Sequence, residues 1–316
     1  MDVHHLQVLR ELRERGSVAA VATAMYVSPS AISQQLATLQ RSAGVPLTRK
    51  DGRRLVLTEA GDALADAAVN VMTALASARS AVDDHLGARG SVVSVAALQS
   101  VAAMWFPGLL AAFSDSTTGP TLRLSDEDVA LDQFPRLVAD YDIVLAHRLS
   151  HSPAWRSRGV TVVPLMHEPL DVAMADTHPL AKNAVIALSD LTSQSWIAVH
   201  AGFPLEPALD ALAAATGRPL TISHRINDFG VARACLANGH DIALMPRYLA
   251  APPADSNVVV RPLAGIELGR DIDLLARPDV LERRAVRVVV EQLTSFAEKA
   301  MANGVRVGRN SRTGQE

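Results

Sequence analysis

The sequence is poor in cysteine and has no long apolar run. Cys235 is the single cysteine among 316 residues, so no intramolecular disulfide can form and the chain suits a reducing cytoplasm. No segment reaches the roughly 18 apolar residues of a membrane-spanning helix. Asp2, His4 and Arg10 interrupt any apolar run that could make a signal peptide. We therefore expect a cytoplasmic protein that does not enter a membrane.

The familiar catalytic motifs are absent as well. The sequence has no GxSxG, no GxxxxGK[ST], no GxGxxG after a strand and no HExxH. His147 and His151 have no third metal ligand nearby in the sequence. We expect no enzyme activity, no metal and no cofactor. A chain of this length is too long for one small core, so two or three domains are expected.

The most informative segment is a predicted helix that begins near residue 28. Ser28 can cap it, and Pro29 suits its first position. Apolar residues fall on one face at helical spacing, and the opposite face is small and polar. Such polar groups can bond to base edges in a major groove and to phosphates. Taken alone, the same face is also typical of a solvated surface helix. The predicted contacts are Ser28, Ser30, Ser33, Gln34, Thr38 and Arg41.

The flanking segments favour DNA binding. A helix over 2–15 and a short helix capped by Ser17 precede the segment, and Tyr26-Val27 makes the turn of a helix-turn-helix. Residues 47–57 then predict a hairpin that turns at Asp51-Gly52. A hairpin of this kind is a wing suited to a phosphate backbone or a minor groove. Its cations are Arg49, Lys50, Arg53 and Arg54.

The charge distribution agrees with this interpretation. Residues 1–58 hold eight Lys/Arg and four Asp/Glu, a balance of +4. The whole chain carries −3, so residues 59–316 must sum to −7. A basic head on an acidic body is the pattern expected when only the head binds DNA.

Residues 59–86 predict one long helix with an apolar residue every three or four positions. This spacing is typical of a coiled-coil seam and predicts a homodimer, and the alternative is a helix packed on its own domain. Gly87 and Gly90 predict a hinge after it. The seam positions are Leu64, Ala68, Val71, Leu75, Ala78 and Val82.

Residues 1–90 resemble the N-terminal region of LysR-type transcriptional regulators. The matching residues are Leu6, Gly16 to Ala20, Ser28 to Ser33, Leu36, Leu39, Gly44, Pro46-Leu47, Arg49 and Leu57 to Gly61. Two positions depart from the family pattern: Gln40 replaces a usual Glu, and Thr48 replaces a usual Phe. The missing aromatic ring removes apolar burial worth about 1 kcal/mol from a small core, which questions the packing of the wing.

The remaining sequence alternates strand and helix patterns, which predicts an α/β fold with a mainly parallel sheet. The resemblance implies a two-lobed domain of the periplasmic-binding-protein type over 91–302, with lobe I at 91–160 and 266–302 and lobe II at 161–265. We expect a crossing between lobes at 160–165, a return to the first lobe at 258–263, and a closing helix over about 280–300. The tail 303–316 is expected to be disordered, because it is rich in Gly, Asn, Ser and Arg.

A cleft between two lobes is where small molecules bind, and the resemblance implies that it holds an effector. Gln99 and Ser100 open a helix, whose free N–H groups favour an anion. His147 and Arg148 could add a cation, and Glu127 an acidic group. The alternative for each of these residues is a simpler role, as a helix cap or as part of the solvated surface. The other positions predicted to line the cleft are His200, Ala201, Gly202, Asp228 and Phe229.

Together these patterns predict a regulator that binds double-stranded DNA under control of a small-molecule effector. The resemblance implies a homodimer or homotetramer that contacts two DNA sites and bends the DNA between them, and contact with RNA polymerase if the protein is an activator. The alternative is a solute-binding protein of the same two-lobed architecture that does not read DNA.

Overall fold

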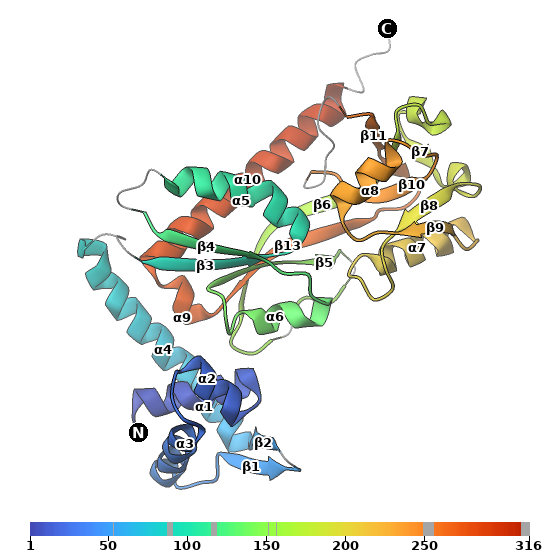
Figure 1. Ribbon diagram of the computed structural model, residues 1–316. Helices are drawn as coiled ribbons and strands as arrows, with labels where there is room; N and C mark the ends of the chain where they lie inside the picture. The colour runs from blue at the N-terminus through green and yellow to red at the C-terminus, as the bar shows by residue number, and fades with distance from the viewer. Residues whose placement is uncertain are drawn as a thin grey trace.

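The computed structural model describes residues 1–52, 54–86, 91–114, 119–150, 152–155, 157–248 and 256–310, with side chains at all of these except 83–86 and 303–310. We name three parts: the head (1–58), the linker helix, and the body (91–310). Figure 1 shows the head at one end of the linker helix, with the larger body alongside the other end. No helix of the described chain is long and apolar enough to cross a membrane.

The head is a helix-turn-helix on a small apolar core. Each of its helices begins at a capping side chain: Asp2 accepts from the His4 N–H, Ser17 from Ala20 and Ser28 from Ala31. Side chains of all three helices and of the linker helix fill one core, which includes Leu9, Leu12, Val21, Ile32, Leu36, Leu39, Ala65 and Ala68. The helices are α1 (Val3–Arg15), α2 (Val18–Ala24) and α3 (Pro29–Ala43).

The wing consists of β1 (Thr48–Asp51) and β2 (Arg54–Leu57), paired antiparallel with Asp51 opposite Arg54. Gly52 turns the chain with a φ of +59°, a conformation that glycine adopts without strain. The predicted hairpin and its turn are confirmed. Arg53 lies outside the described residues.

The two departures from the family pattern contact each other. The Gln40 side-chain oxygen accepts hydrogen bonds from the Leu47 N–H and the Thr48 N–H, both at 2.9 Å, and from the Thr48 hydroxyl at 3.2 Å. The wing is therefore fastened to α3 by polar contacts.

The linker helix α4 (Glu59–Leu86) packs on its own chain along one side. Ala65, Ala68 and Met72 are buried in the head core, and the Ser80 hydroxyl accepts from Arg287 of the body at 3.2 Å. The later seam positions face outward, with Val71 39% and Val82 59% exposed. The helix is confirmed. Its early seam positions Leu64 and Ala68 pack on the chain's own head, as the alternative interpretation expected, and pairing with a second chain stays a prediction for the later ones. The predicted hinge at 87–90 lies outside the described residues.

The body contains a large mixed sheet with the order β4-β3-β5-β13-β6-β10-β8-β9, in which β11 also pairs with β6, and a separate two-stranded sheet of β7 and β12. Strands of the first lobe are β3 (Val92–Ala97), β4 (Thr121–Asp126), β5 (Ile143–Leu149) and β13 (Gly269–Ala276). Strands of the second lobe are β7 (Ile186–Ala187), β8 (Ser195–Ala198), β9 (Thr221–Arg225), β10 (Ile242–Pro246), β11 (Val258–Arg261) and β12 (Leu263–Ala264). Figure 1 shows β6 (Thr161–Ala175) running through both.

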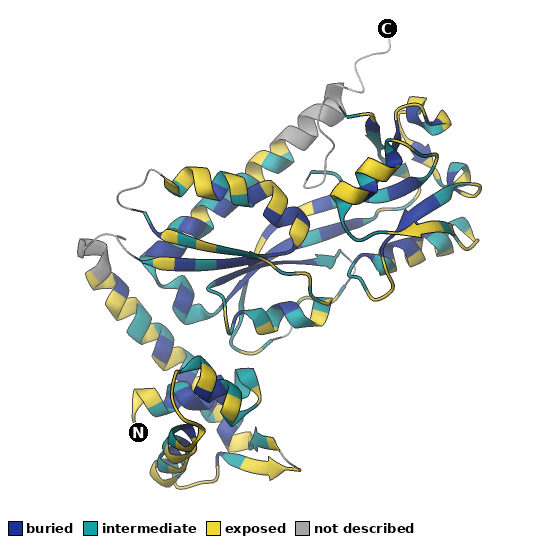
Figure 2. Ribbon diagram, viewed as in Figure 1, coloured by how far each residue is buried: buried dark blue, intermediate teal, exposed yellow. Residues whose placement is uncertain are grey.

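Helices cover the sheet and bury its core (Figure 2). In the first lobe they are α5 (Gln99–Ser114), α6 (Phe134–Leu137), α9 (Pro278–Leu281), α10 (Arg284–Asn310) and the short 3₁₀ helix η1 (Leu131–Gln133). In the second lobe they are α7 (Glu206–Thr216), α8 (Phe229–Leu236), η2 (Pro179–Lys182) and η3 (Leu188–Leu191). The two lobes have separate apolar clusters, one around Trp105 and Leu109 and the other around Trp196 and Leu212.

Several sequence expectations about the body were wrong. The predicted crossing at 160–165 is part of one continuous strand, because β6 pairs with β13 up to Pro169 and with β10 from Leu170. Residues 258–261 stay in the second lobe, paired with β6, and the return comes after β12. Four of the pairings of β6 and β13 are antiparallel, so the sheet is mixed. Helix α10 continues to Asn310, past the expected start of the tail. Adding residues to an existing helix avoids the unfavourable step of forming a first helical turn.

Candidate DNA surface and interlobe cavity

The polar face of α3 lies open to solvent. Ser28, Ser30, Ser33, Gln34 and Arg41 are exposed and Thr38 is half-buried, while Ile32, Leu36 and Leu39 on the other face are buried. The structure thus brings together the six side chains that the sequence predicted for DNA contact.

Two hydroxyl groups of this face donate hydrogen bonds to the backbone of α3. The Ser33 hydroxyl donates to the Pro29 carbonyl, and the Thr38 hydroxyl to the Gln34 carbonyl, both at 2.9 Å. The Thr38 oxygen also accepts from Arg41 Nη2 at 3.0 Å, so of the two hydroxyls it is Ser33 whose oxygen suits a donor such as the amino group of adenine or cytosine. The Gln34 amide carries both a donor and an acceptor, which matches the edge of an adenine.

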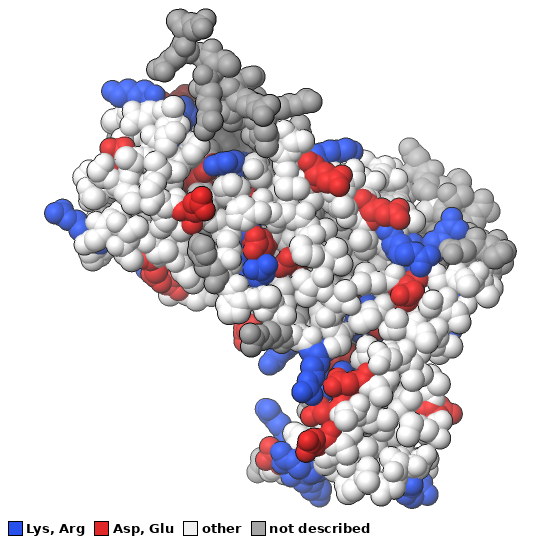
Figure 3. All heavy atoms as spheres, turned by 180° about the vertical axis from the view of Figure 1, so that it is seen from behind, with Lys and Arg blue, Asp and Glu red and all other residues white. Residues whose placement is uncertain are grey.

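Cations gather on the wing. Arg49, Lys50 and Arg54 are exposed, and none forms an ion pair with another described residue. Figure 3 shows Lys and Arg atoms collected at the tip of the head that the wing forms. Unpaired cations beside a helix-turn-helix are placed to contact phosphates.

Other cations of the head face the body instead. Arg10 contacts Asp279 at 3.1 Å. Arg15 contacts Asp140 at 2.8 Å and also donates to the Ala139 carbonyl at 2.5 Å. Sequence reasoning missed this contact, because the pairs are separated by 124 to 269 positions.

A small cavity of about 20 Å³ lies between the lobes. Four of its lining residues were predicted, namely Gln99, Ser100, Glu127 and His147. Phe203 and Pro204 line it from the second lobe, and Arg270 lines it from β13.

Arg270 is the residue of the cavity that the sequence did not reveal. Its guanidinium is 0% exposed, with Nε 2.8 Å from the Glu168 carboxylate and Nη2 2.9 Å from the Ser100 hydroxyl. Nη1 has no hydrogen-bond partner among the described residues. Glu168 also accepts from the Tyr248 N–H at 2.7 Å, which ties the guanidinium to the junction of the lobes. There was little signal for it in the sequence, because Arg270 stands beside Asp271 and Asp273 in β13 and such charges are usually exposed.

His147 and Arg148 do not supply the cation expected of them. Both lie in β5, so alternate residues point to opposite faces of the sheet. His147 is 2% exposed, and burial together with the charge of Arg270 holds its pKa well below 6.5, so the ring is neutral. Arg148 pairs with Asp271 at 2.9 Å and with Asp273 at 3.0 Å and does not line the cavity.

The two lobes are bridged beside the cavity. The Gln99 side-chain amide donates to the Asp228 carboxylate of the second lobe. Asp228 also caps α8 by accepting from the Val231 N–H at 2.7 Å. That bond is the main reason why the pKa of Asp228 lies below its ordinary value. The simpler role of a helix cap therefore applies to Asp228, in addition to its contact across the lobes.

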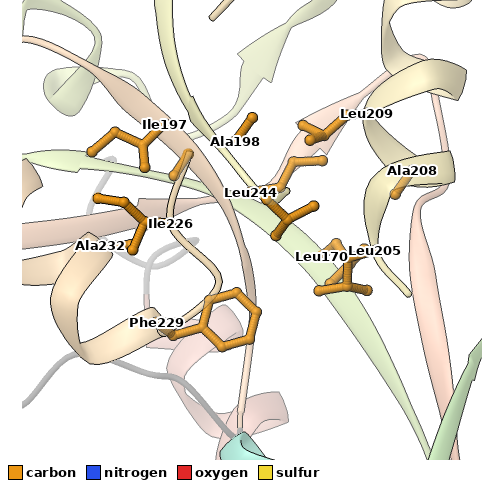
Figure 4. A pocket seen from close by; sticks show the side chains of 12 residues that line it. Leu170, Ile197, Ala198, Leu205, Ala208, Leu209, Ile226, Phe229, Ala232 and Leu244 are labelled. Carbon is orange, nitrogen blue, oxygen red and sulfur yellow. The ribbon is translucent and has the colours of Figure 1, made fainter. Parts of the chain in front are cut away.

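The remaining predicted residues lie on the second lobe. His200, Ala201 and Gly202 are exposed in the loop after β8 and do not line the interlobe cavity. Phe229 lines a second small pocket of about 20 Å³. Figure 4 shows that apolar side chains from β6, β8, α7 and α8 surround it. Among the described residues, no group of three or more His, Cys, Asp or Glu could hold a metal ion.

Comparison with known proteins connects both regions to one family. The model of the bacterial regulatory helix-turn-helix protein, lysR family, matches residues 3–62, and that of the LysR substrate binding domain matches residues 86–298. A probable nitrogen assimilation transcriptional activator of Synechococcus elongatus is 25% identical over 288 residues, covering 91% of this chain and 92% of the relative.

Solved structures share the fold. A full-length OxyR from Pseudomonas aeruginosa has a TM-score of 0.64 at 17% identity, covering 94% of each chain. Full-length CbnR in complex with its target DNA has a TM-score of 0.51 at 22% identity, covering 94% of this chain and 100% of that one.

Proposed function

The chain belongs to the LysR family of bacterial transcriptional regulators, with a DNA-binding head and an effector-binding body, and we propose that an effector in the interlobe cavity controls how the heads engage DNA. In this proposal α3 reads base edges, the wing holds the backbone, and the body senses the small molecule. The helix-turn-helix match argues against the alternative of a solute-binding protein without a DNA-reading role.

One observation carries the proposal: the bond between Gln99 and Asp228 spans the lobes beside a cavity that both lobes line. A molecule in this cavity would contact both lobes at once. A ligand shifts a conformational equilibrium only through its different affinity for the two forms. A site between the lobes provides such a difference, because the contacts exist only when the lobes are close.

A short chain of contacts supports coupling to the head. Glu127 lines the cavity and accepts from the Tyr141 hydroxyl at 2.5 Å. The adjacent Asp140 pairs with Arg15 of α1. A displacement of Glu127 would therefore displace residues 139–141, which the head contacts through Arg15.

The assembly is the family's homodimer through α4, and two such dimers would form a homotetramer with four heads. The exposed seam positions Val71, Ala78 and Val82 support this pairing. The tetramer would contact two DNA sites and bend the DNA between them. If the protein activates transcription, the proposal includes a contact with RNA polymerase.

The test uses Gln99→Ala without any ligand. The variant loses the bond between the lobes but leaves the Asp228 cap of α8 intact, so we expect the lobes to open more readily. The length of the DNA footprint and the DNA bend angle on a fragment selected by the wild-type protein should change. The matched control is Gln133→Ala, because the Gln133 amide bonds to Asp132 within one lobe. Identical footprints and bends for Gln99→Ala and the wild type would contradict the proposal.

A further inference from the structure

We propose that Tyr26, in the turn between α2 and α3, is a further DNA-contacting residue, whose hydroxyl group donates a hydrogen bond to a backbone phosphate beside the major groove. This inference rests on the proposed function, since it assumes that α3 reads base edges, and it adds a contact that neither α3 nor the wing supplies.

The backbone of Tyr26 is the first reason. Its φ is +55°, and it is the one non-glycine residue with a positive φ in the described part of the chain. A bulky side chain is disfavoured in this left-handed conformation, which glycine and asparagine adopt more readily. A tyrosine here therefore lowers the stability of the head unless its side chain forms contacts that compensate.

The side chain forms no such contacts within its own chain. Tyr26 is 96% exposed, more than any other large apolar or aromatic residue that the structure describes. It does not pack against the apolar core of the head, whereas the preceding Met25 does. Its hydroxyl has no hydrogen-bond partner among the described residues. An unfavourable backbone conformation without compensating contacts is typical of a residue that serves a binding partner.

The position of the turn indicates which partner. In a helix-turn-helix the second helix enters the major groove with its N-terminal residues on the bases, and the first helix crosses the backbone. The turn that joins them lies where groove and backbone meet. Tyr26 stands two residues before Ser28, at the start of the exposed polar face of α3. We therefore expect a phosphate beside Tyr26, and a tyrosine hydroxyl is a suitable donor to phosphate oxygen.

A hydroxyl contact differs from the cations of the wing in a measurable way. A lysine or arginine that neutralises a phosphate releases a counterion, so its loss decreases the slope of log K against log salt. A tyrosine hydroxyl carries no charge at neutral pH and releases no counterion. Loss of the Tyr26 hydroxyl should therefore weaken binding by the same factor at every salt concentration.

Binding titrations of Tyr26→Phe test the contact on a fragment selected by the wild-type protein and on random DNA. The substitution removes only the hydroxyl, so affinity should fall about tenfold on both DNAs while the salt slope stays unchanged. The matched control is Tyr248→Phe, which removes a tyrosine hydroxyl from the body and should leave DNA affinity unaltered.

Tyr26→Asn separates binding from stability. Asparagine suits a positive φ better than tyrosine does, so this variant should resist denaturant as well as the wild type or better. Its side chain is shorter, so its affinity for both DNAs should fall at least as far as that of Tyr26→Phe. A tyrosine with a merely structural role would instead lose stability on substitution and keep its affinity.

Acetylation of tyrosine hydroxyls in the full chain tests the contact without a substitution. Peptide mass spectrometry should show rapid modification of Tyr26 in the free protein and protection in the DNA complex, with the half-buried Tyr248 as the internal reference. Protection could also come from a second subunit. If Tyr26 is protected in the free wild-type assembly but not in Val71→Asp, whose charge should separate the subunits, Tyr26 belongs to a subunit contact and the inference is wrong.

Three further results would overturn the inference. Wild-type affinity of Tyr26→Phe would show that the hydroxyl makes no contact. A loss confined to the selected fragment would assign Tyr26 to a base edge. Equal acetylation of Tyr26 with and without DNA would place the turn away from the DNA.

This inference and base reading by α3 fail separately. If Tyr26→Phe binds like the wild type while replacement of Ser33 and Gln34 weakens binding to the selected fragment, the phosphate contact is wrong and base reading stands. If Tyr26→Phe weakens binding to both DNAs while replacement of Ser33 and Gln34 changes neither, the phosphate contact stands and base reading by these side chains is wrong.

Discussion

Arg10 of the head and Asp279 of the body form an ion pair, with Nη1 3.1 Å from the carboxylate, although 269 positions separate them in the chain. Arg10 is only 4% exposed and lies beside Glu11 and Glu14 as well. Burial alone would lower its pKa, but the neighbouring carboxylates, Asp279 foremost, outweigh burial and raise it. The head is therefore held to the body by a charged group with little access to water.

We expect Asp279→Asn to loosen this contact. Loss of a hydrogen bond to a buried charged group costs about 1–3 kcal/mol. Hydrogen exchange of α1 should become faster in the full chain. The control is Asp66→Asn, because the Asp66 carboxylate pairs with Arg13 but is half exposed, and such pairs contribute at most about 1 kcal/mol. If both substitutions changed the hydrogen exchange of α1 equally, the pair with Asp279 would stabilise the attachment of the head no more than an exposed ion pair does.

The exposed face of α3 should determine sequence preference. Replacing Ser33 and Gln34 together with alanine should cost roughly 1–3 kcal/mol per lost base contact on the preferred sequence while sparing random DNA. Binding titrations on both DNAs at one salt concentration provide the measurement. Ser42→Ala, at an exposed site near the end of α3, is the control. Equal loss on both DNAs would refute the role of these two side chains as base readers.

The wing should act through charge alone. Arg54→Gln removes one exposed cation, so affinity should fall on every sequence and the slope of log K against log salt should decrease by about one unit. Arg123→Gln removes an exposed cation of the body and should leave the slope unchanged. An unaltered slope in Arg54→Gln would mean that this arginine does not contact DNA.

The open side of α4 should mediate pairing of chains. Val71→Asp places a charge where the single chain leaves 39% of the side chain exposed, so the fold tolerates it. In an apolar interface the same charge would cost several kcal/mol. Sedimentation should therefore show dissociation to monomers. Asn70→Asp adds the same charge to a neighbouring exposed position and should leave the assembly intact. A Val71→Asp protein that keeps the wild-type mass would place the interface elsewhere.

Burial of His147 predicts a pH dependence of stability. Burial and the nearby Arg270 hold its folded pKa well below 6.5, so the unfolded chain binds this proton more readily. The contribution of the neutral His147 ring to the free energy of unfolding is complete above about pH 6.5. This contribution is lost as the pH falls toward the pKa of the folded state. The slope should approach 1.4 kcal/mol per pH unit for one proton. Denaturation of His147→Gln across this range should show that slope reduced, and an unchanged slope would assign the proton to another group.

Local chemistry predicted the head closely. The capping residues Ser17 and Ser28 predicted the starts of α2 and α3, and the Asp51-Gly52 pair predicted the turn of the wing, because these signals depend on residues a few positions apart. Ser100 was located for the same reason, since it opens a helix after a strand.

The features that were missed depend on distant partners. Arg270 reaches Ser100 across 170 positions, and no local pattern states which strand will lie beside β5. The same holds for β11, whose sequence suits either lobe and whose place is decided by pairing with β6. Side-chain direction in β5 likewise separated His147 from Arg148, which the sequence had grouped as neighbours.

The continuous strand β6 has a mechanical consequence. It exchanges β13 for β10 between Pro169 and Leu170, so the backbone crosses from one lobe to the other without a break in the strand. Strands accommodate a range of twist while keeping their hydrogen bonds, and the range is widest where few strands are paired. A change of twist at this point would therefore reorient the two lobes about a strand that both of them share. Under the proposed function, such a twist would also move the heads, because Arg10 and Arg15 of each head contact the first lobe.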